Sequence, residues 1–277
     1  MLKKIILCLS DSYKDTLIHT KEFASFAEEM EKHGTMAEIA NTGDIVSRDA
    51  LYISDDADML SSLQGRGCYT VALYHKGSSG LLTGTQYALE GLKDADWEYL
   101  YKVYQRFAHI PWDITQTKRC SIREMCEEDV DALYKLYADP QITRFTEGLF
   151  EQKEQEKQYI RDYIKNVYEY YGFGTWLIHR KEDGQLIGRA GFNYRPGFEE
   201  VELGFVIGVP YQKNGYAYEV CSHLLDLGKN AYEFDKVQAL VKEENEASIR
   251  LLTGLGFSNV EKINQKGEEY LRYVRSL

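Results

Sequence analysis

The chain has 277 residues, 44% of them hydrophobic and 13% aromatic, which supplies enough apolar material for two folded domains. Its formal net charge of -11 at pH 7 argues against a nucleic-acid backbone as the main partner, since phosphate binding needs a basic face. No stretch approaches the roughly 20 apolar residues of a membrane span, and the five cysteines form no Cys-x-x-Cys pair, so we expect a soluble cytoplasmic protein without a disulfide framework or zinc site.

The first part of the chain alternates short strand-like and helix-like segments. Apolar runs predict strands over 5–9, 51–53 and 70–74, and apolar side chains at helical spacing predict helices over 20–32 and 58–63. Such an alternation is typical of a small α/β domain with parallel strands.

A further helix is predicted over 96–107, where apolar side chains again recur at helical spacing. Pro111 cannot continue that helix. We therefore expect the connection between two domains to lie between residues 108 and 118, and to be packed rather than flexible because it contains Trp112 and Ile114.

Three acids, Asp55, Asp56 and Asp58, follow the strand predicted at 51–53, where an α/β sheet usually binds its ligand. The motif resembles the metal-binding acidic motif of haloacid-dehalogenase-type phosphatases. Those enzymes also need an Asp-x-Asp pair after the first strand, and this chain has Ser10-Asp11-Ser12-Tyr13 there. The missing pair favours an N-capping acidic turn over a magnesium site. We expect a degenerate or regulatory α/β domain, or one that contributes to the acceptor pocket.

The second part of the chain predicts a sheet whose strands are joined mainly by turns, which favours antiparallel neighbours. The expected strands cover 120–124, 175–180, 186–194, 200–207, 236–241 and 270–274, and the expected helices cover 130–138, 152–171, 218–232 and 247–255.

The segment Gln212-Lys213-Asn214-Gly215-Tyr216-Ala217 follows an apolar strand that breaks at Pro210, and it leads into a helix. A strand, a glycine turn and a helix leave backbone N–H groups unpaired in front of the helix N-terminus. This arrangement predicts an anion site, most naturally for a diphosphate.

This pattern resembles the acyl-coenzyme A pyrophosphate loop of the GNAT superfamily of N-acetyltransferases. A second match follows at the expected distance: Asn245-Glu246-Ala247-Ser248, a short amphipathic helix, and Leu255-Gly256-Phe257. The resemblance covers nearly all of the chain from Arg119 onward, and it includes Rim-type members in its Glu-Leu-Gly-Phe strand motif at 202–205.

The resemblance implies acetyl-CoA as co-substrate. It assigns the pantetheine to strand residues Phe205, Val206 and Ile207 and a further cofactor contact to Asn245, which is equally suited to cap a helix. By the same resemblance, the pyrophosphate contacts the backbone N–H groups of Lys213, Asn214, Gly215, Tyr216, Ala217 and Tyr218.

Deprotonation of the acceptor amine is assigned to Glu202, for which a solvated strand position is the alternative. Many superfamily members carry a tyrosine seven positions after the motif Asn as a general acid, and this chain has Leu252 there. Eight aromatic residues near the expected cleft suit either an acceptor pocket or, as we favour, core packing. These residues are Tyr163, Tyr168, Tyr170, Tyr171, Phe173, Trp176, Phe192 and Tyr194.

Together these patterns predict an α/β chain of two domains. Residues 1–115 are expected to form a small Rossmann-like α/β domain of unknown role, and residues 116–277 an α+β acetyltransferase domain with a mixed, mostly antiparallel sheet. The predicted function is acetyl transfer from acetyl-CoA to a primary amine, either a protein N-terminus or a small amine, by direct attack in a ternary complex. The alternative is a non-catalytic acyl-CoA sensor. This alternative is supported by Leu252 in the tyrosine position and by the first half of the chain, to which no role is assigned. We expect neither nucleic acid nor a membrane as partner, and no metal.

Overall fold

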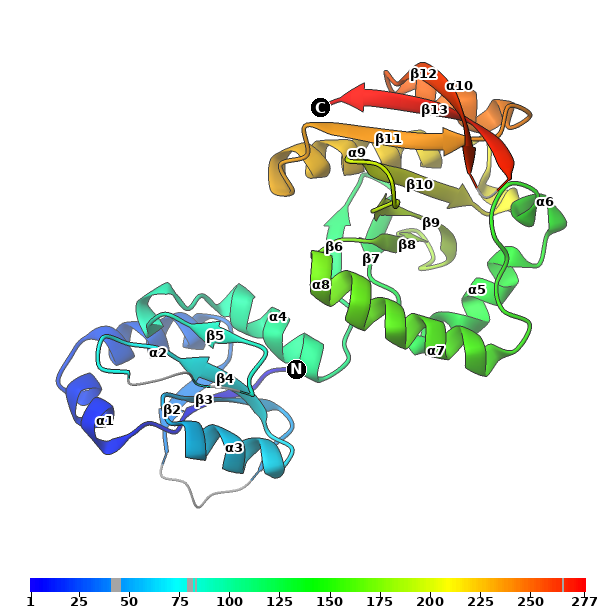
Figure 1. The fold of residues 1–277 in the computed structure, drawn as a ribbon. Helices are drawn as coiled ribbons and strands as arrows, with labels where there is room; N and C mark the ends of the chain where they lie inside the picture. The colour runs from blue at the N-terminus through cyan, green and yellow to red at the C-terminus, as the bar shows by residue number, and fades with distance from the viewer. Residues whose placement is uncertain (41–45, 79–81, 83, 266) are drawn as a thin grey trace. The chain divides into compact units, whose positions relative to one another are not determined.

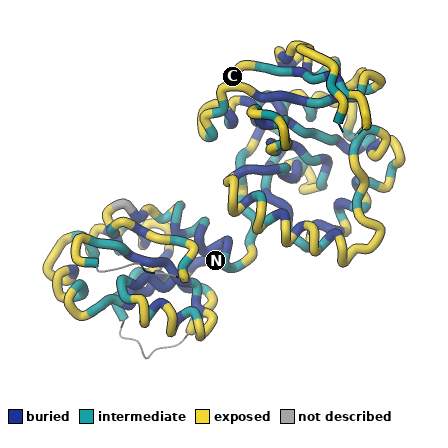
Figure 2. The backbone as a smooth tube through the Cα atoms, in the orientation of Figure 1, coloured by how far each residue is buried: buried dark blue, intermediate teal, exposed yellow. Residues whose placement is uncertain are grey.

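The computed structural model describes residues 1–40, 46–78, 82, 84–265 and 267–277 (Figure 1). The chain divides into two compact units, Met1–Ile110 and Pro111–Leu277. In each unit the buried residues follow the central strands of the sheet, whereas the surface helices and loops carry the exposed ones (Figure 2).

The N-terminal unit contains a parallel sheet. Over its described residues, the sheet has five strands in the order β2-β1-β3-β4-β5, and all four neighbouring pairs are parallel. This confirms the prediction of a parallel α/β unit. The strands are β1 Lys4–Leu7, β2 Met36–Ile39, β3 Ala50–Ser54, β4 Tyr69–Leu73 and β5 Ala88–Leu89.

Amphipathic helices cover this sheet. Helix α4 is typical: Leu100, Val103 and Tyr104 are buried at helical spacing, and the carboxylate of Asp96 accepts the Tyr99 N–H at 2.6 Å as an N-cap. The helices of the unit are α1 Asp11–Ile18, α2 Glu22–Lys32, α3 Ala57–Gly65, the 3₁₀ turn η1 Leu92–Asp94 and α4 Trp97–Phe107.

The C-terminal unit is built on a mixed sheet. Over residues 111–265 and 267–277, eight strands run in the order β12-β13-β11-β10-β9-β8-β7-β6, and the β10–β11 pair is parallel while the other pairs are antiparallel. The predicted fold class is therefore confirmed. The strands are β6 Asp113–Gln116, β7 Cys120–Arg123, β8 Thr175–Arg180, β9 Leu186–Asn193, β10 Val201–Ile207, β11 Lys236–Val241, β12 Ser258–Gln265 and β13 Glu268–Ser276.

Helices pack on both faces of this sheet. On β9, Phe192 lies under α9, where a Cβ added to Gly228 would meet its ring at 3.1 Å, whereas Asn193 on the opposite face bonds to Tyr163 of α7. The helical segments are η2 Glu127–Asp129, α5 Val130–Tyr137, α6 Pro140–Thr143, α7 Lys153–Tyr163, the π-helical η3 Ile164–Tyr168, α8 Glu169–Tyr171, η4 Val209–Tyr211, α9 Tyr216–Ala231 and α10 Glu246–Gly254.

The segment expected to connect two domains is in part a strand. Asp113–Gln116 forms β6 and pairs with β7, so only the residues before it are free to connect. The single long helix predicted at 152–171 is continuous but contains the π-helical turn η3. Among the helices of the described residues, none has the length and apolarity that would let it cross a membrane.

Candidate active site

The loop between β10 and α9 has the backbone of an anion site. Lys213 and Gly215 adopt left-handed conformations, with φ of 61° and 79°, and α9 starts immediately afterwards without a side-chain cap. Within the described residues, the backbone N–H groups of residues 213 through 218 have no hydrogen-bond acceptor. Six consecutive donors therefore surround the positive end of a helix.

Three carbonyl groups in and beside this loop, by contrast, accept hydrogen bonds from side chains. Gln212 Nε2 donates to the Ile207 carbonyl at 2.9 Å, Asn214 Nδ2 to the Gln212 carbonyl at 2.9 Å, and Arg119 Nη1 to the Asn214 carbonyl at 3.0 Å. These bonds fix the loop in a shape that leaves its N–H groups unused. The site is thus preorganised for a negatively charged ligand.

Arg119 holds this loop against the start of α9. Its Nε donates to Glu219 at 2.6 Å, and its guanidinium lies 4.2 Å from the centre of the Tyr216 ring. The hydrogen bond to Glu219 raises the pKa of Arg119. Burial pushes the pKa of Glu219 upward, but hydrogen bonds from Thr117 and Arg119 outweigh it and lower that pKa. The ion pair is therefore stable across the neutral range.

Strands β10 and β11 separate next to this loop. Over the described residues they pair only at Val201–Val237 and Glu202–Gln238, although β10 continues to Ile207 and β11 to Val241. Beyond that point β10 is paired only with β9. Every second residue of an antiparallel strand directs its N–H and C=O away from its partner. Part of the backbone of residues 204–207 is therefore available on the side from which β11 has separated.

The strand residues predicted to bind the cofactor lie where β10 has separated from β11. Phe205 and Val206 are half-buried and Ile207 is buried, and all three lie on the separated part of β10 that runs into the loop. Asn245 caps α10, because its Oδ1 accepts the Ser248 N–H at 3.2 Å. Leu252 is 1% exposed within the hydrophobic core of the unit, so its side chain takes no part in surface chemistry.

Glu202, the predicted base, is paired with an arginine that sequence reasoning missed. Both oxygens of its carboxylate accept bonds from Arg195, Oε2 from Nε and Oε1 from Nη2 at 3.1 Å, and Arg195 Nη1 also donates to Gln265 at 2.8 Å. The side chain of Glu202 is 13% exposed and that of Arg195 is 36% exposed. The ion pair spans the β9–β10 turn, so the signal in the sequence was opposite charges at the two ends of a predicted hairpin.

The eight aromatic residues divide into two groups. Tyr163, Tyr168, Phe173, Trp176 and Phe192 are buried in the core, as the favoured interpretation predicted. The remaining three, Tyr170, Tyr171 and Tyr194, are exposed by 41% or more.

The acidic motif of the N-terminal unit is satisfied by the protein itself. The carboxylate of Asp55 accepts Ser10 N–H at 2.7 Å, Ser10 Oγ–H at 2.6 Å and a bond from His75 Nε2 at 3.0 Å. Asp56 caps α3 by accepting the Met59 N–H at 2.7 Å, which is the capping role that the sequence favoured. Asp58 is exposed in the first turn of α3. Among the described residues, no group of three His, Cys, Asp or Glu side chains is placed to hold a metal ion.

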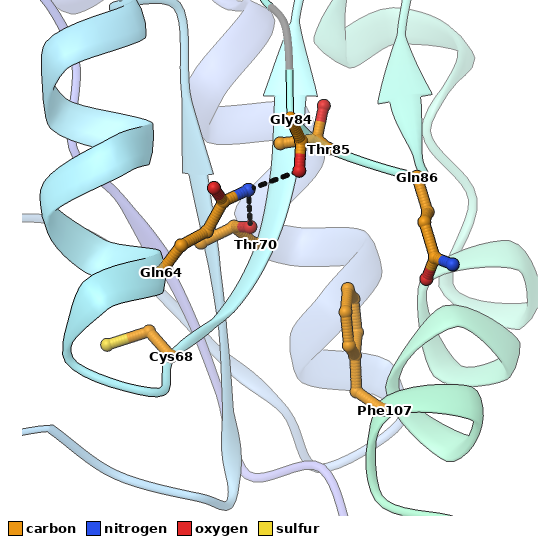
Figure 3. Close-up of a pocket in the computed structure, with 7 residues that line it drawn as sticks. All are labelled: Gln64, Cys68, Thr70, Gly84, Thr85, Gln86 and Phe107. Atoms are coloured by element: carbon orange, nitrogen blue, oxygen red, sulfur yellow. Dashed lines mark hydrogen bonds between the residues drawn. The ribbon is translucent and has the colours of Figure 1, made fainter.

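A pocket of about 230 Å³ lies elsewhere in the N-terminal unit, between α3, β4 and α4 (Figure 3). Gln64 crosses one side of it and donates to Thr70 Oγ1 at 3.2 Å and to the Gly84 carbonyl at 2.8 Å, while the Phe107 ring forms another side. The lining includes no carboxylate and no histidine. The Cys68 thiol is the one titratable side chain among the described lining residues, and burial raises its pKa.

A diphosphate-type loop at the start of a helix, beside two separated parallel strands of a mixed sheet, defines an acyl-CoA-type transferase fold. Residues 119–258, just over half of the chain, match the Acetyltransferase (GNAT) domain family. The chain belongs to the GNAT family of acetyltransferases, which are N-acetyltransferases that use acetyl-CoA.

Known proteins support this assignment. The "Uncharacterized N-acetyltransferase YoaA" of Bacillus subtilis (strain 168) is 31% identical over 147 residues, which is 52% of this chain and 82% of YoaA. A solved "Putative GnaT-family acetyltransferase from Bordetella pertussis" is 20% identical, with a TM-score of 0.52 over 60% of this chain and 100% of that one. RimL, titled a ribosomal L7/L12 alpha-N-protein acetyltransferase in complex with coenzyme A, is 16% identical, with a TM-score of 0.52 over 60% of this chain and 98% of its own. At these identities the two solved structures show the shared fold.

Proposed function

We propose that this protein transfers the acetyl group of acetyl-CoA to a primary amine, a protein N-terminus or a small amine, by direct attack within a ternary complex in the cytoplasm. In this proposal the C-terminal unit, Pro111–Leu277, carries the activity as a Rim-type domain, and the N-terminal unit, Met1–Ile110, is a small α/β domain of unknown role. The observation that carries the proposal is the row of N–H groups at residues 213–218, at the start of α9, for which the described part of the chain supplies no acceptor. RimL, whose title names an alpha-N-protein acetyltransferase, supports the α-amine as one acceptor.

The cofactor would bind along a continuous path. The diphosphate would accept hydrogen bonds from the N–H groups of residues 213–218, and the pantetheine arm would pair with the free backbone side of 205–207 where β11 has separated. Asn245 would contact the cofactor while it caps α10. Fixing the thioester in this way contributes to the rate by lowering the entropic cost of bringing it to the amine.

The amine must lose its proton before it attacks the thioester. A protein α-amine has a pKa of about 7.7–8.0, so its neutral form costs about 1 kcal/mol at pH 7, whereas a lysine amine near 10.4 costs roughly 4–5 kcal/mol. We propose Glu202 as the acceptor of that proton. Arg195 donates one hydrogen bond to each oxygen of this carboxylate, so the proton must reach one of the remaining lone pairs, directly or through a water molecule. Such a constrained base suits the more acidic α-amine.

The leaving thiolate needs little help from the protein. A thiol has a pKa of about 8.5, so coenzyme A departs tolerably as an anion. A general acid typically contributes about 10²–10⁴-fold. Since Leu252 occupies the tyrosine position and is buried, we expect a turnover lower than in relatives that carry the tyrosine.

The first experiment is a calorimetric titration of the full chain with acetyl-CoA, followed by thiol-release assays over a panel of amines that includes peptide N-termini. We expect micromolar binding and transfer to at least one amine. Absence of binding would overturn the cofactor assignment. Tight binding without transfer to any amine would instead favour a non-catalytic acyl-CoA sensor.

A further inference from the structure

Arg189 on β9 is a charged side chain without a charged partner. Its Nε atom is buried and has no acceptor within the described residues. Among these residues the one hydrogen bond of the Arg189 side chain runs from Nη1 to Tyr137 Oη at 3.5 Å, the outer limit for such a bond. Other arginines of this unit, Arg119, Arg123 and Arg195, each pair with a carboxylate. Arg189 as a whole is partly buried, but leaving its buried Nε–H without an acceptor is costly, and a ligand that supplied the acceptor would remove this cost.

The strand register places Arg189 on the same face of the sheet as the proposed base. Arg189 lies opposite Val206 and Asn193 opposite Glu202, and directly opposed residues of an antiparallel pair share a face. Gly204 lies between Glu202 and Val206 on that face, and a Cβ added to it would meet only Asn193 Nδ2 within 4 Å, at 3.7 Å. Gly204 therefore leaves room for at least a methyl group on the sheet surface between the base and the arginine.

Two tyrosines add donors next to this guanidinium. Tyr137 Oη accepts the Arg189 bond, which leaves its own proton without an acceptor, and the Tyr159 hydroxyl likewise has no hydrogen-bond partner within the described residues. Burial raises the pKa of Tyr159 while Arg189 opposes the rise, so the two groups are electrostatically coupled. Tyr163 and Tyr168, also near Arg189, use their hydroxyls in bonds to Asn193 and Thr175. Within the described residues, the unused donors around Arg189 are its own Nε–H and the hydroxyl protons of Tyr137 and Tyr159. The carboxylates of Glu147 and Glu156 also act on Tyr159.

We propose that Arg189, helped by the hydroxyls of Tyr137 and Tyr159, binds a carboxylate carried by the acceptor amine. The acceptor is then amino-acid-like: its amine reaches over Gly204 toward the thioester while its carboxylate pairs with the guanidinium. An arginine forms two parallel hydrogen bonds with a carboxylate, which fixes orientation as well as affinity. This inference rests on the proposed transfer reaction and narrows its substrate class.

The test compares amino acids with the corresponding amino-acid amides as acceptors for the full chain. Loss of the carboxylate charge makes the amine of the amide less basic and its free base more abundant, so the comparison is biased against the proposal. We expect the wild type to prefer the acid by about 10²-fold in kcat/KM, and Arg189→Met to lose that preference through a fall of the same size for the acid alone. Arg189→Lys should restore part of it. Acetyl-CoA affinity should stay unchanged in both variants.

Thermal unfolding provides the control for a structural role. A partly buried guanidinium without an ion-pair partner does not stabilise the fold, so Arg189→Met should melt at the wild-type temperature or above. Arg123→Met, which breaks the ion pair with Asp129, should melt lower and keep the preference for the acid. A lower melting temperature of Arg189→Met with an intact preference would overturn the proposal in favour of a structural role.

The two proposals fail in distinguishable ways. Equal rates for acid and amide in the wild type would overturn the carboxylate site and leave acetyl transfer standing. If acetyl-CoA neither binds nor reacts, the proposed function fails, and the carboxylate site is then judged by thermal shift alone. Stabilisation of the wild type, but not of Arg189→Met, by amino acids over their amides would support the site in that case, and equal shifts would overturn it.

Discussion

In the N-terminal unit the carboxylate of Asp55 is surrounded by donors from Ser10 and His75. In the C-terminal unit, by contrast, the N–H groups of residues 213–218 face no acceptor among the residues that the structure describes. Both features follow the end of a strand and precede a helix, where α/β proteins commonly bind ligands. They differ in whether the protein has already used their hydrogen-bonding capacity.

This difference separates a structural motif from a binding site. Ring nitrogen Nδ1 of His75 accepts the Gly77 N–H at 3.1 Å, so the proton of the neutral ring lies on Nε2 and is donated to Asp55. Tyr13 stacks on that ring at 3.8 Å and closes the cluster. A magnesium ion would have to displace three protein donors from Asp55, whereas a diphosphate at residues 213–218 would displace none. Unused hydrogen-bonding capacity, rather than resemblance to a known motif, distinguishes the proposed binding loop from the acidic motif.

The largest expected effect comes from Gly215→Val. Valine strongly disfavours the left-handed conformation of Gly215, so the loop must change shape and its N–H groups turn away from the ligand. We expect acetyl-CoA affinity to fall by about 10²-fold or more, measured by calorimetry, because several charge-assisted hydrogen bonds are lost together.

Gly172→Val is the matched control for this change. Gly172 has a φ of 74° and no atoms within 4 Å of an added Cβ, so it suffers the same backbone strain away from the loop. It should lose similar stability, on the order of 1–2 kcal/mol, and bind acetyl-CoA like the wild type. Equal losses of affinity in both variants would show that strain, and not the loop, governs binding.

Glu202 is the strongest test of this comparison, because it is a proposed functional group whose two carboxylate oxygens already accept hydrogen bonds from Arg195. Its partner Arg195 is 36% exposed, whereas Asp55 and its partner His75 are 2% and 15% exposed, so only the first pair opens easily to solvent. We expect Glu202→Gln to lower kcat/KM about 10²-fold, the typical contribution of a general base. Arg195→Gln should lower it much less. Similar decreases of kcat/KM in both variants, accompanied by lower melting temperatures, would show that the ion pair has a structural role.

The sequence predicted the interior of both sheets but not their edges. Strands β1, β3 and β4 of one sheet and β7 to β11 and β13 of the other were all anticipated, whereas β2, β5, β6 and β12 were not. These four are the terminal strands of their sheets. An edge strand has one neighbour and less apolar burial, and β12 is almost entirely exposed, so the alternation of apolar residues that reveals a strand is weak there.

In the candidate site, too, the features that depend on local sequence were predicted and those that depend on distant contacts were missed. The loop at 212–217 was predicted because its glycine and helix start are local features of the chain. Arg119, Arg189 and Arg195 were missed because their significance depends on contacts with distant or cross-strand residues: Arg119 meets Glu219 across 100 positions. Charge pairing across a fold leaves no periodic signal in one sequence. The partner of Arg195 lies only seven positions away across a hairpin, so this one pair does have a local signal in the sequence.

The smallest expected effect concerns the filled site, through Asp55→Asn. An asparagine accepts at one atom only and presents donors at the other, so at least one bond from Ser10 or His75 is lost at a side chain that is 2% exposed. We expect the N-terminal unit to lose about 2 kcal/mol of unfolding free energy in urea at pH 7, with acetyl-CoA binding unchanged. Asp58→Asn, an exposed position in the same motif, should change stability by less than about 0.5 kcal/mol.

The pH dependence of this loss gives a second readout. Burial pushes the pKa of Asp55 upward, but the hydrogen bonds from Ser10 and His75 outweigh it and hold that pKa below its ordinary value. A depressed folded-state pKa stabilises the fold above the unfolded pKa of about 3.9, and this stability is lost as the pH falls through the folded value. The difference between wild type and Asp55→Asn should therefore be full at pH 7 and shrink below pH 4. A magnesium-dependent rise in the melting temperature that disappears in Asp55→Asn would contradict this account and make the acidic motif a metal site.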